Sequence, residues 1–125
     1  HARNLTDAQL KKIGETGGVA GLNFERNYIH GKESTLDDLV EHALHMIEVA
    51  GVDHIGIGSD YDGGTPPAEL DNAGKIQALA EALRKRGVSE ADVHKIFGGN
   101  TLRVIEWAKA RRNAAKNGES KPARP

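Results

Sequence analysis

The sequence predicts an α/β fold in which two parallel strands form part of a larger sheet. Residues 19–24 are a compact apolar run after a glycine break, and residues 55–58 alternate isoleucine with glycine, so both predict buried strands. The helical pattern between them is long enough for the crossover that parallel neighbours need. Two fully buried strands require layers on both faces and further strands beside them, so the sheet is expected to be incomplete.

The first predicted element is a short helix. Thr6 and Gln9 have the spacing of a capping box, and Gly17 provides the stop. The strand at 19–24 follows. Residues 25–34 are polar and are expected to form the loop beyond it.

The second helix connects the two predicted strands. It opens at Thr35, which has Asp38 at its third position, and it ends at Gly51. One face of this helix is apolar and carries Leu36, Leu39, Val40, Ala43 and Ile47. The second strand cannot continue beyond Ser59, because residues 60–67 contain glycines and prolines.

Three more helices are predicted after this loop, with the third ending at Gly87 and the fourth opening at Ser89. Their apolar positions are Ile76, Leu79, Ala80 and Leu83, then Val93, Ile96 and Phe97, then Leu102, Val104, Ile105, Trp107 and Ala108. Gly98, Gly99 and Asn100 are expected to interrupt the helical structure and to cap the fifth helix. That helix is expected to fray into residues 111–125, a basic and flexible tail.

Composition narrows the class of protein. A chain of 125 residues that is 38% hydrophobic, with a net charge of −1, suits a soluble globular protein. The compartment, cytoplasm or periplasm, is left open. No apolar run approaches the roughly 20 residues of a membrane-spanning helix, and the start lacks a signal-peptide pattern. The absence of cysteine excludes a disulfide framework within the chain. A nucleic-acid partner is not expected, because the basic C-terminal stretch lacks interleaved aromatic residues.

The segment around Asp60 is the most informative for function. The second strand delivers this carboxylate to its C-terminal end, where parallel α/β barrels and sheets build their active sites. The alternative is that Asp60 and Asp62 only turn the backbone, as aspartates in glycine-rich loops often do. A dinucleotide-binding loop is not indicated, because the glycine spacing does not match its fingerprint.

Six short motifs carry a resemblance to a known family. They are Arg-Asn-Leu-Thr-Asp at 3–7, Glu-Thr-Gly-Gly-Val at 15–19, Asn-Phe at 23–24, Thr-Leu-Asp-Asp at 35–38, Gly-Ile-Gly-Ser-Asp-Tyr-Asp-Gly at 56–63 and Gly-Gly-Asn-Thr-Leu-Arg-Val at 98–104. In this order and spacing they resemble the C-terminal part of the membrane (renal) dipeptidase family, peptidase family M19.

The resemblance implies a zinc-dependent dipeptidase on a (β/α)8 TIM barrel of the metallo-dependent hydrolase type. Residues 1–110 would be its C-terminal portion, with the two strands as the last two of eight. The family's two zinc ions are bound by residues on earlier strands, and none of those ligands matches a residue of this chain. His1, in place of an initiator methionine, fits a piece of something longer. The N-terminal part of the barrel is therefore expected as a companion segment or chain, with a homodimer as a candidate assembly.

The resemblance also assigns roles to individual residues. Asp60 matches the catalytic aspartate. Arg3 matches the arginine that contacts the substrate's C-terminal carboxylate, a task that suits a planar guanidinium; the alternative is an ordinary surface arginine. Tyr28 falls where a family tyrosine lines the substrate pocket, and a rim contact explains it equally well. Asn23 ends its strand on the same rim and could contact substrate or hold loop backbone.

Two histidines on the second helix invite a metal-site reading. His42 and His45 are three residues apart, but neither has a Glu or Cys partner in a recognised pattern, so a solvated helix face is expected. His54 is expected at the opposite, non-catalytic end of its strand.

The sequence thus predicts a metallo-dipeptidase acting on dipeptides, with Asp60 and Arg3 supplied by this chain. The alternative is a non-catalytic fragment or subunit that lacks metal ligands and only completes a barrel.

Overall fold

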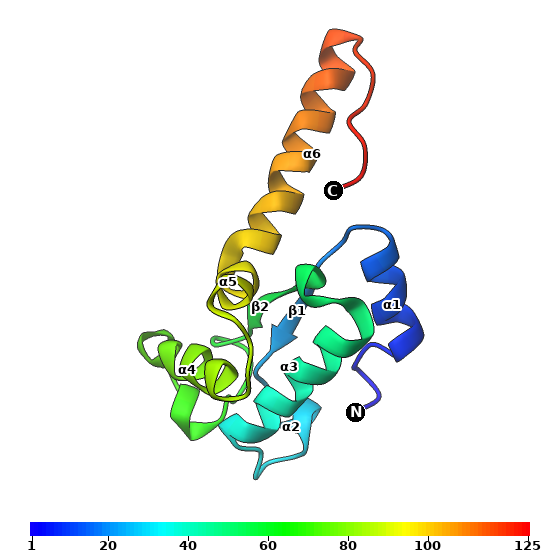
Figure 1. The fold of residues 1–125 in the computed structure, drawn as a ribbon. Coiled ribbons are helices and arrows are strands. Elements are labelled where there is room, and N and C mark those ends of the chain that lie inside the picture. Colours follow the sequence, from blue (N-terminus) through cyan, green and yellow to red (C-terminus); the bar gives the residue numbers. More distant parts are fainter.

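Two parallel strands lie at the centre of the molecule (Figure 1). A computed structural model describes residues 1–125, in which β1 (Ala20–Asn23) pairs with β2 (Ile55–Ser59). Leu22 lies opposite Ile57, and a shift in register then places Asn23 opposite Ser59. The crossover between the strands contains α3 (Leu36–Ala50). The parallel pair and its crossover confirm the predicted α/β arrangement.

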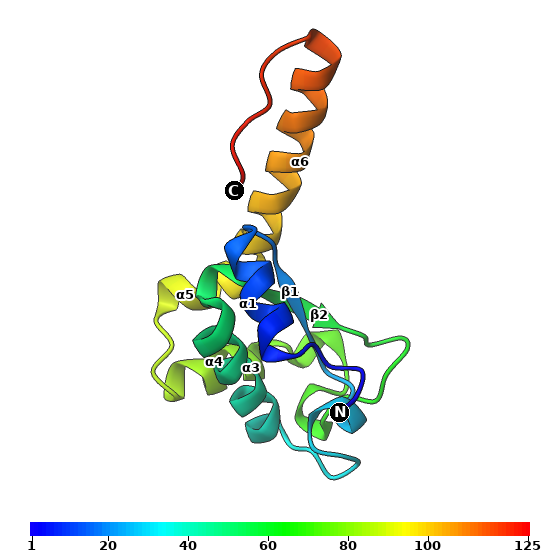
Figure 2. The ribbon, with the colours of Figure 1, turned by 90° about the vertical axis from the view of Figure 1, so that its right-hand side faces the viewer.

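The helices gather on one side of this sheet, as Figure 2 shows. They are α1 (Asp7–Glu15), α3, α4 (Gln77–Lys85) and α5 (Glu90–His94). The single turn of α2 (Arg26–Ile29) follows the end of β1, and α6 (Asn100–Asn117) projects away from the body. None of the helices is both long and apolar enough to cross a membrane.

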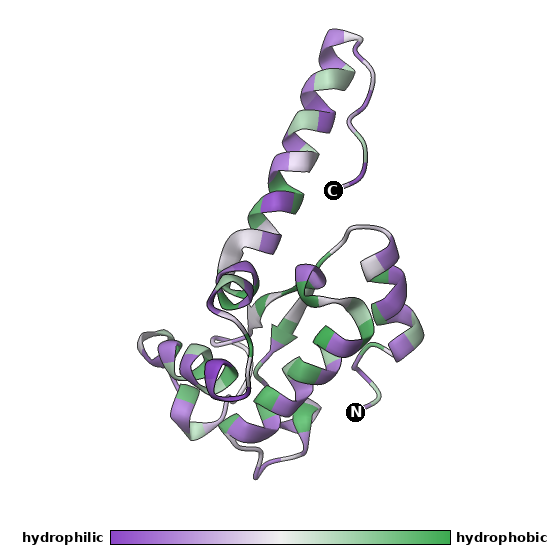
Figure 3. Ribbon diagram, viewed as in Figure 1, coloured by the Kyte–Doolittle hydropathy of each residue, from purple (hydrophilic) through white to green (hydrophobic).

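The hydrophobic core lies between the strands and the helices. Figure 3 shows hydrophobic residues concentrated on the strands and α3, whereas the outer part of α6 is largely hydrophilic. The fully buried aliphatic and aromatic side chains include Leu22, Phe24, Leu39, Val40, Ile55, Leu79, Leu83 and Ile96. The opposite face of the sheet presents Gly21 and Gly58, both exposed. On this face only Gly56, which lies against Thr101 and Val19, is buried, so the full burial of both faces expected from the sequence is not found within this chain.

The predicted capping boxes form in both helices. The Thr6 hydroxyl accepts from the Gln9 backbone N–H, and the Gln9 side chain accepts from the Thr6 N–H at 2.9 Å. Thr35 and Asp38 make the same reciprocal pair at the start of α3. Each side chain satisfies N–H groups that have no partner within the helix, which sets where the helix begins.

Two predicted boundaries are wrong. The segment expected as loop contains α2, a single helical turn whose N-cap is Glu25. The last helix does not fray from residue 111 but continues to Asn117 and ends at Gly118, which has a φ of +70°. Residues beyond it run back along α6, where Trp107 Nε1 donates to the Ala123 carbonyl at 2.6 Å. The division into a barrel portion and a flexible tail stays a prediction.

Asn100 does not cap α6, contrary to the expectation. It is 3% exposed, and its Nδ2 donates to the carbonyls of Val52 and Ile55, each at 2.8 Å. Arg103, one turn later, donates to the Gly17 carbonyl at 3.0 Å and the Asp53 carbonyl at 2.6 Å. The motif at 98–104 therefore fastens α6 to the N-terminal end of β2, away from Asp60.

The apolar side of α6 is only partly covered. Leu102 is 58% exposed and Ile105 is 43% exposed, although both are among the apolar positions predicted for this helix. The helix was therefore predicted correctly, but none of its predicted apolar positions is buried.

Candidate active site

Asp60 lies where the backbone leaves β2. Ser59 has a φ of +40° and Asp60 a φ of +74°, so two successive non-glycine residues occupy left-handed conformations. The Asp60 carbonyl accepts from the N–H groups of Gly63 at 3.2 Å and Gly64 at 2.7 Å, which stabilises this turn. Such conformations are uncommon and tend to occur at functional sites. The turn holds the Asp60 side chain at the carboxyl end of the sheet.

Asn23 links the ends of the two strands. Its Nδ2 donates to Asp60 Oδ2 at 3.1 Å, and its Oδ1 accepts from the Glu25 backbone N–H at 2.7 Å. The backbones are joined at the same place, because the Phe24 N–H donates to the Ser59 carbonyl at 2.9 Å. Asn23 and Asp60, predicted separately as site residues, are therefore in direct contact.

Glu25 is a buried acid that the sequence analysis did not single out. It is 8% exposed and accepts hydrogen bonds from the backbone N–H groups of Thr65 and Asn27. The Thr65 N–H, followed by that of Asn27, holds the pKa of Glu25 below its usual value, against the opposing effect of burial. The Arg26 N–H also donates to the Thr65 carbonyl at 3.1 Å. Glu25 thus ties the loop after Asp60 to the end of β1.

Only one sequence signal could have identified Glu25. It directly precedes the turn of α2 and accepts from the Asn27 N–H, as an N-cap residue does. The partner at Thr65 lies 40 positions away, where no local pattern could reveal it.

Arg3 and Tyr28 are brought together from different parts of the chain. Arg3 Nη1 donates to the Tyr28 hydroxyl, and the guanidinium carbon lies 4.9 Å from the centre of the tyrosine ring. The Asn4 side chain donates to the Tyr28 carbonyl at 2.6 Å, and the His1 ring lies 5.1 Å from the Tyr28 ring. The Arg3 side chain remains exposed, which leaves donors available for an anionic ligand.

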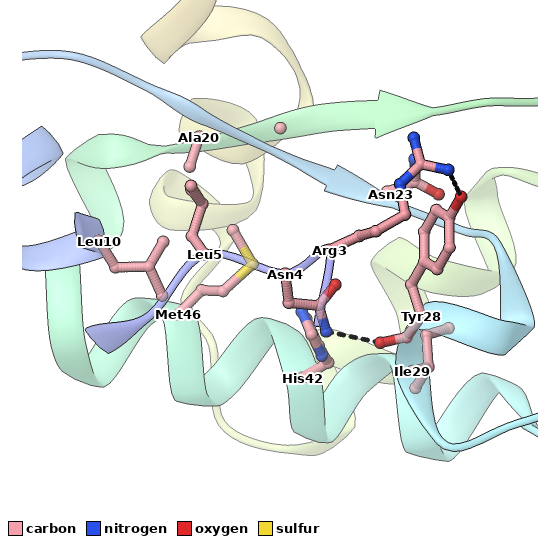
Figure 4. Close-up of a pocket in the computed structure, with 11 residues that line it drawn as sticks. Arg3, Asn4, Leu5, Leu10, Ala20, Asn23, Tyr28, Ile29, His42 and Met46 are labelled. Carbon is pink, nitrogen blue, oxygen red and sulfur yellow. Dashed lines mark hydrogen bonds between the residues drawn. The ribbon is translucent and has the colours of Figure 1, made fainter. Parts of the chain in front are cut away.

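A cavity of about 220 Å³ extends between this N-terminal segment, β1 and α3 (Figure 4). Its polar end holds Arg3, Tyr28 and Asn23, and its other end is lined by apolar side chains that include Leu10 and Met46. Three of the four predicted site residues therefore share one cavity. Asp60 does not line it and is connected to it through Asn23.

His42 corrects one sequence expectation. Its side chain is half-buried and lines the cavity, so it does not lie on a solvated face. Burial is the main cause that lowers the pKa of His42, and the nearby His45 and the N-terminal amino group lower it further. His45 is exposed, as expected, and its Nε2 lies 2.8 Å from Asp7 Oδ1. His54 lies at the start of β2, with Nδ1 2.8 Å from the Gly18 carbonyl.

The chain does not assemble a metal site from its own side chains. No three His, Cys, Asp or Glu residues form a group that could hold a metal ion. The acids nearest the rim, Asp60 and Glu25, are instead bonded to amide N–H groups.

Comparison with known proteins identifies the family. The family model described as membrane dipeptidase (peptidase family M19) matches residues 1–119. This chain belongs to peptidase family M19. Among curated M19-like relatives, it is 39% identical over 108 residues to the dipeptidase ataJ of Aspergillus terreus, a match that covers 83% of this chain and 26% of the relative. The chain spans 26–40% of the length of the curated relatives it matches.

Solved structures place the fold among M19 metallopeptidases. A metallopeptidase from Rhodobacter sphaeroides, described with a phosphinate mimic of the dipeptide L-Ala-D-Ala, is 35% identical with a TM-score of 0.78. That match covers 83% of this chain and 31% of the solved one. An amidohydrolase from Pseudomonas aeruginosa is 30% identical with a TM-score of 0.76, over 85% of this chain and 41% of its own. The α/β fold expected from the sequence thus agrees with its M19 neighbours.

Proposed function

We propose that this M19 chain forms the last two strands of a (β/α)8 barrel, and that the assembled protein hydrolyses the peptide bond of dipeptides. The observation that carries the proposal is the grouping of Arg3, Tyr28, Asn23 and Asp60 at the carboxyl end of the sheet. Active sites of parallel barrels lie at this end. Similarity to dipeptidases over most of the chain supports the choice of substrate class.

Arg3 binds the C-terminal carboxylate of the dipeptide in this proposal. Its guanidinium is exposed and already oriented by the Tyr28 hydroxyl and ring. A planar guanidinium with free N–H donors matches a carboxylate in geometry and charge. Tyr28 acts by holding Arg3 in place, and its ring forms the adjoining wall of the cavity.

Asp60 handles the proton. As water attacks the peptide carbonyl, the Asp60 carboxylate accepts a proton from that water. It then gives the proton to the leaving amine as the C–N bond breaks. The role requires a carboxylate at the rim with one oxygen free for the reacting groups, and only Oδ2 of Asp60 is bonded to another side chain.

The zinc ions of the proposed enzyme are assigned to ligands from outside these 125 residues. The side chains of this chain do not fit a metal site, because no group of three suitable ligands forms. The steps given to Arg3 and Asp60 involve only their own atoms. A homodimer of the assembled enzyme belongs to the same proposal.

The decisive experiment replaces Asp60 in the assembled enzyme, formed with the N-terminal part of the barrel. For Asp60→Asn we expect kcat on a panel of dipeptides to fall at least about 100-fold, with KM little changed, because the amide cannot carry the proton. Asp62→Asn is the matched control, since Asp62 is exposed and makes no side-chain hydrogen bond. An Asp60→Asn enzyme with undiminished kcat would refute the assignment.

A second candidate function is a non-catalytic subunit that completes a barrel. The lack of a metal-holding group and the two-stranded sheet favour it. Mixing this chain with the N-terminal part of an M19 barrel separates the two candidates. A stable complex without dipeptidase activity, at full metal occupancy, would support the structural role alone.

A further inference from the structure

The hydrogen bonds of Asn23 indicate a role other than contact with substrate. The carboxylate of Asp60 has one side-chain partner, the Nδ2 atom of Asn23, at 3.1 Å. The orientation of the Asn23 amide is not arbitrary, because its Oδ1 faces the Glu25 backbone N–H at 2.7 Å. A backbone N–H can only donate, so the oxygen must lie there and the NH2 group must face Asp60.

The position of Asn23 is set by both strands. The register shift after Leu22 places Asn23 opposite Ser59, which is the residue that precedes Asp60. The backbone N–H of Glu25 donates to the Asn23 amide oxygen. The Glu25 carboxylate in turn accepts from the backbone N–H groups of Thr65 and Asn27. A chain of hydrogen bonds therefore runs from the loop after β2, through Glu25 and Asn23, back to Asp60.

The other oxygen of Asp60, Oδ1, lies against Gly63 and accepts no hydrogen bond from another side chain. A Cβ atom on Gly63 would lie 2.6 Å from Asp60 Oδ1, closer than real Cβ contacts allow. Glycine at this position therefore leaves Oδ1 the space that a side chain would occupy, while Asn23 restrains Oδ2. One carboxylate oxygen is thus held by a hydrogen bond, and the other accepts none from a side chain of this chain.

We propose that Asn23 is a positioning residue for Asp60, an inference that rests on the proposed dipeptidase function. Its Nδ2–H restrains Oδ2 and so fixes the orientation of the carboxylate that exchanges a proton with the water and the leaving amine. Both ends of the Asn23 amide are engaged within the protein, which favours this role over the substrate contact expected from the sequence. Preorganisation of this kind matters because a small misplacement of a catalytic group costs a large factor in rate.

The test is Asn23→Asp in the assembled enzyme. The new side chain keeps its size and still accepts from the Glu25 N–H, but it cannot donate to Asp60 and places a second carboxylate beside it. We expect kcat to fall about 10- to 100-fold with KM within about twofold. Asn72→Asp is the matched control, because exposed Asn72 also accepts from a backbone N–H two residues on and donates to an aspartate, which is Asp71 and not Asp60. Its kcat is expected to stay within about threefold of the wild type.

A double variant distinguishes positioning from general loosening of the loop. If Asn23 acts through Asp60, adding Asn23→Asp to Asp60→Asn lowers kcat no further. Full activity of Asn23→Asp beside an inactive Asp60→Asn would overturn the positioning role and leave the proposed function intact. An equal loss in Asn72→Asp, or an additive loss in the double variant, would also overturn it. Full activity of Asp60→Asn would instead remove the proposed function, and the positioning role with it.

Discussion

The anchoring of α6 by Asn100 leads to a prediction that this chain alone can test. Asn100→Ala removes the donor that both the Val52 and the Ile55 carbonyls use. Leaving the buried Ile55 carbonyl unpaired should cost about 1–3 kcal/mol of folding stability. Leaving the part-buried Val52 carbonyl unpaired should cost about 1 kcal/mol more. The free energy of unfolding should therefore fall by about 2–4 kcal/mol.

This loss converts into a shift in melting temperature. The entropy of unfolding is about 2.1 cal/mol/K per residue, or about 0.26 kcal/mol/K for a chain of 125 residues. The expected decrease in Tm is then about 8–15 °C. Urea unfolding followed by circular dichroism gives the free energy independently, and Asn117→Ala, an exposed position near the end of α6, serves as the matched control.

Asn100→Asp sharpens the test. The carboxylate has nearly the same shape but directs oxygen atoms at two carbonyl oxygens, so at pH 7 it should destabilise at least as much as alanine. If Asn100→Asp matched the wild type, hydrogen-bond donation would not be the anchor, and the reasoning from these two contacts would fail.

Two further predictions concern the candidate active site. Glu25→Gln should lower stability at pH 7, because the pKa of Glu25 is depressed in the folded state. Its contribution is present above the unfolded value near 4.5 and is lost as the pH falls through the lower folded value, so the urea midpoints of wild type and variant should converge below about pH 4.5. Midpoints with a constant separation across that range would contradict the assignment. Arg3→Ala should raise KM for dipeptides about tenfold or more in the assembled enzyme, with a partial effect for Arg3→Lys, because the guanidinium fork binds the terminal carboxylate. Steady-state kinetics measures this, and an unchanged KM would count against the role of Arg3.

Local signals in the sequence were sufficient for most helices and both strands. The pairs Thr6–Gln9 and Thr35–Asp38 predicted two helix starts because each capping interaction spans only three residues. The isoleucine and glycine alternation predicted β2, and the proline and glycine content after it predicted the loop. The turn of α2 was missed because four residues provide no helical periodicity to detect.

Residues whose partners lie far along the chain could not be understood in this way. Asn100 looked like a helix cap, since asparagine after two glycines is typical of one, yet it bonds to carbonyls that precede it by more than 40 positions. His42 looked solvated because a helical pattern does not show whether a neighbouring segment covers that face. The sequence did not indicate a role for Glu25, because its partner Thr65 lies in another loop.

The sequence by itself determined the elements, their order and the delivery of Asp60 to the end of a strand, because capping, periodicity and turn chemistry act over a few residues. The tertiary structure alone decided that Arg3 meets Tyr28, that Asn23 bonds to Asp60 and that Glu25 ties the loop to β1. Those contacts depend on the parallel pairing of β1 with β2, which brings together strand ends that are separated in the chain by the whole of α3.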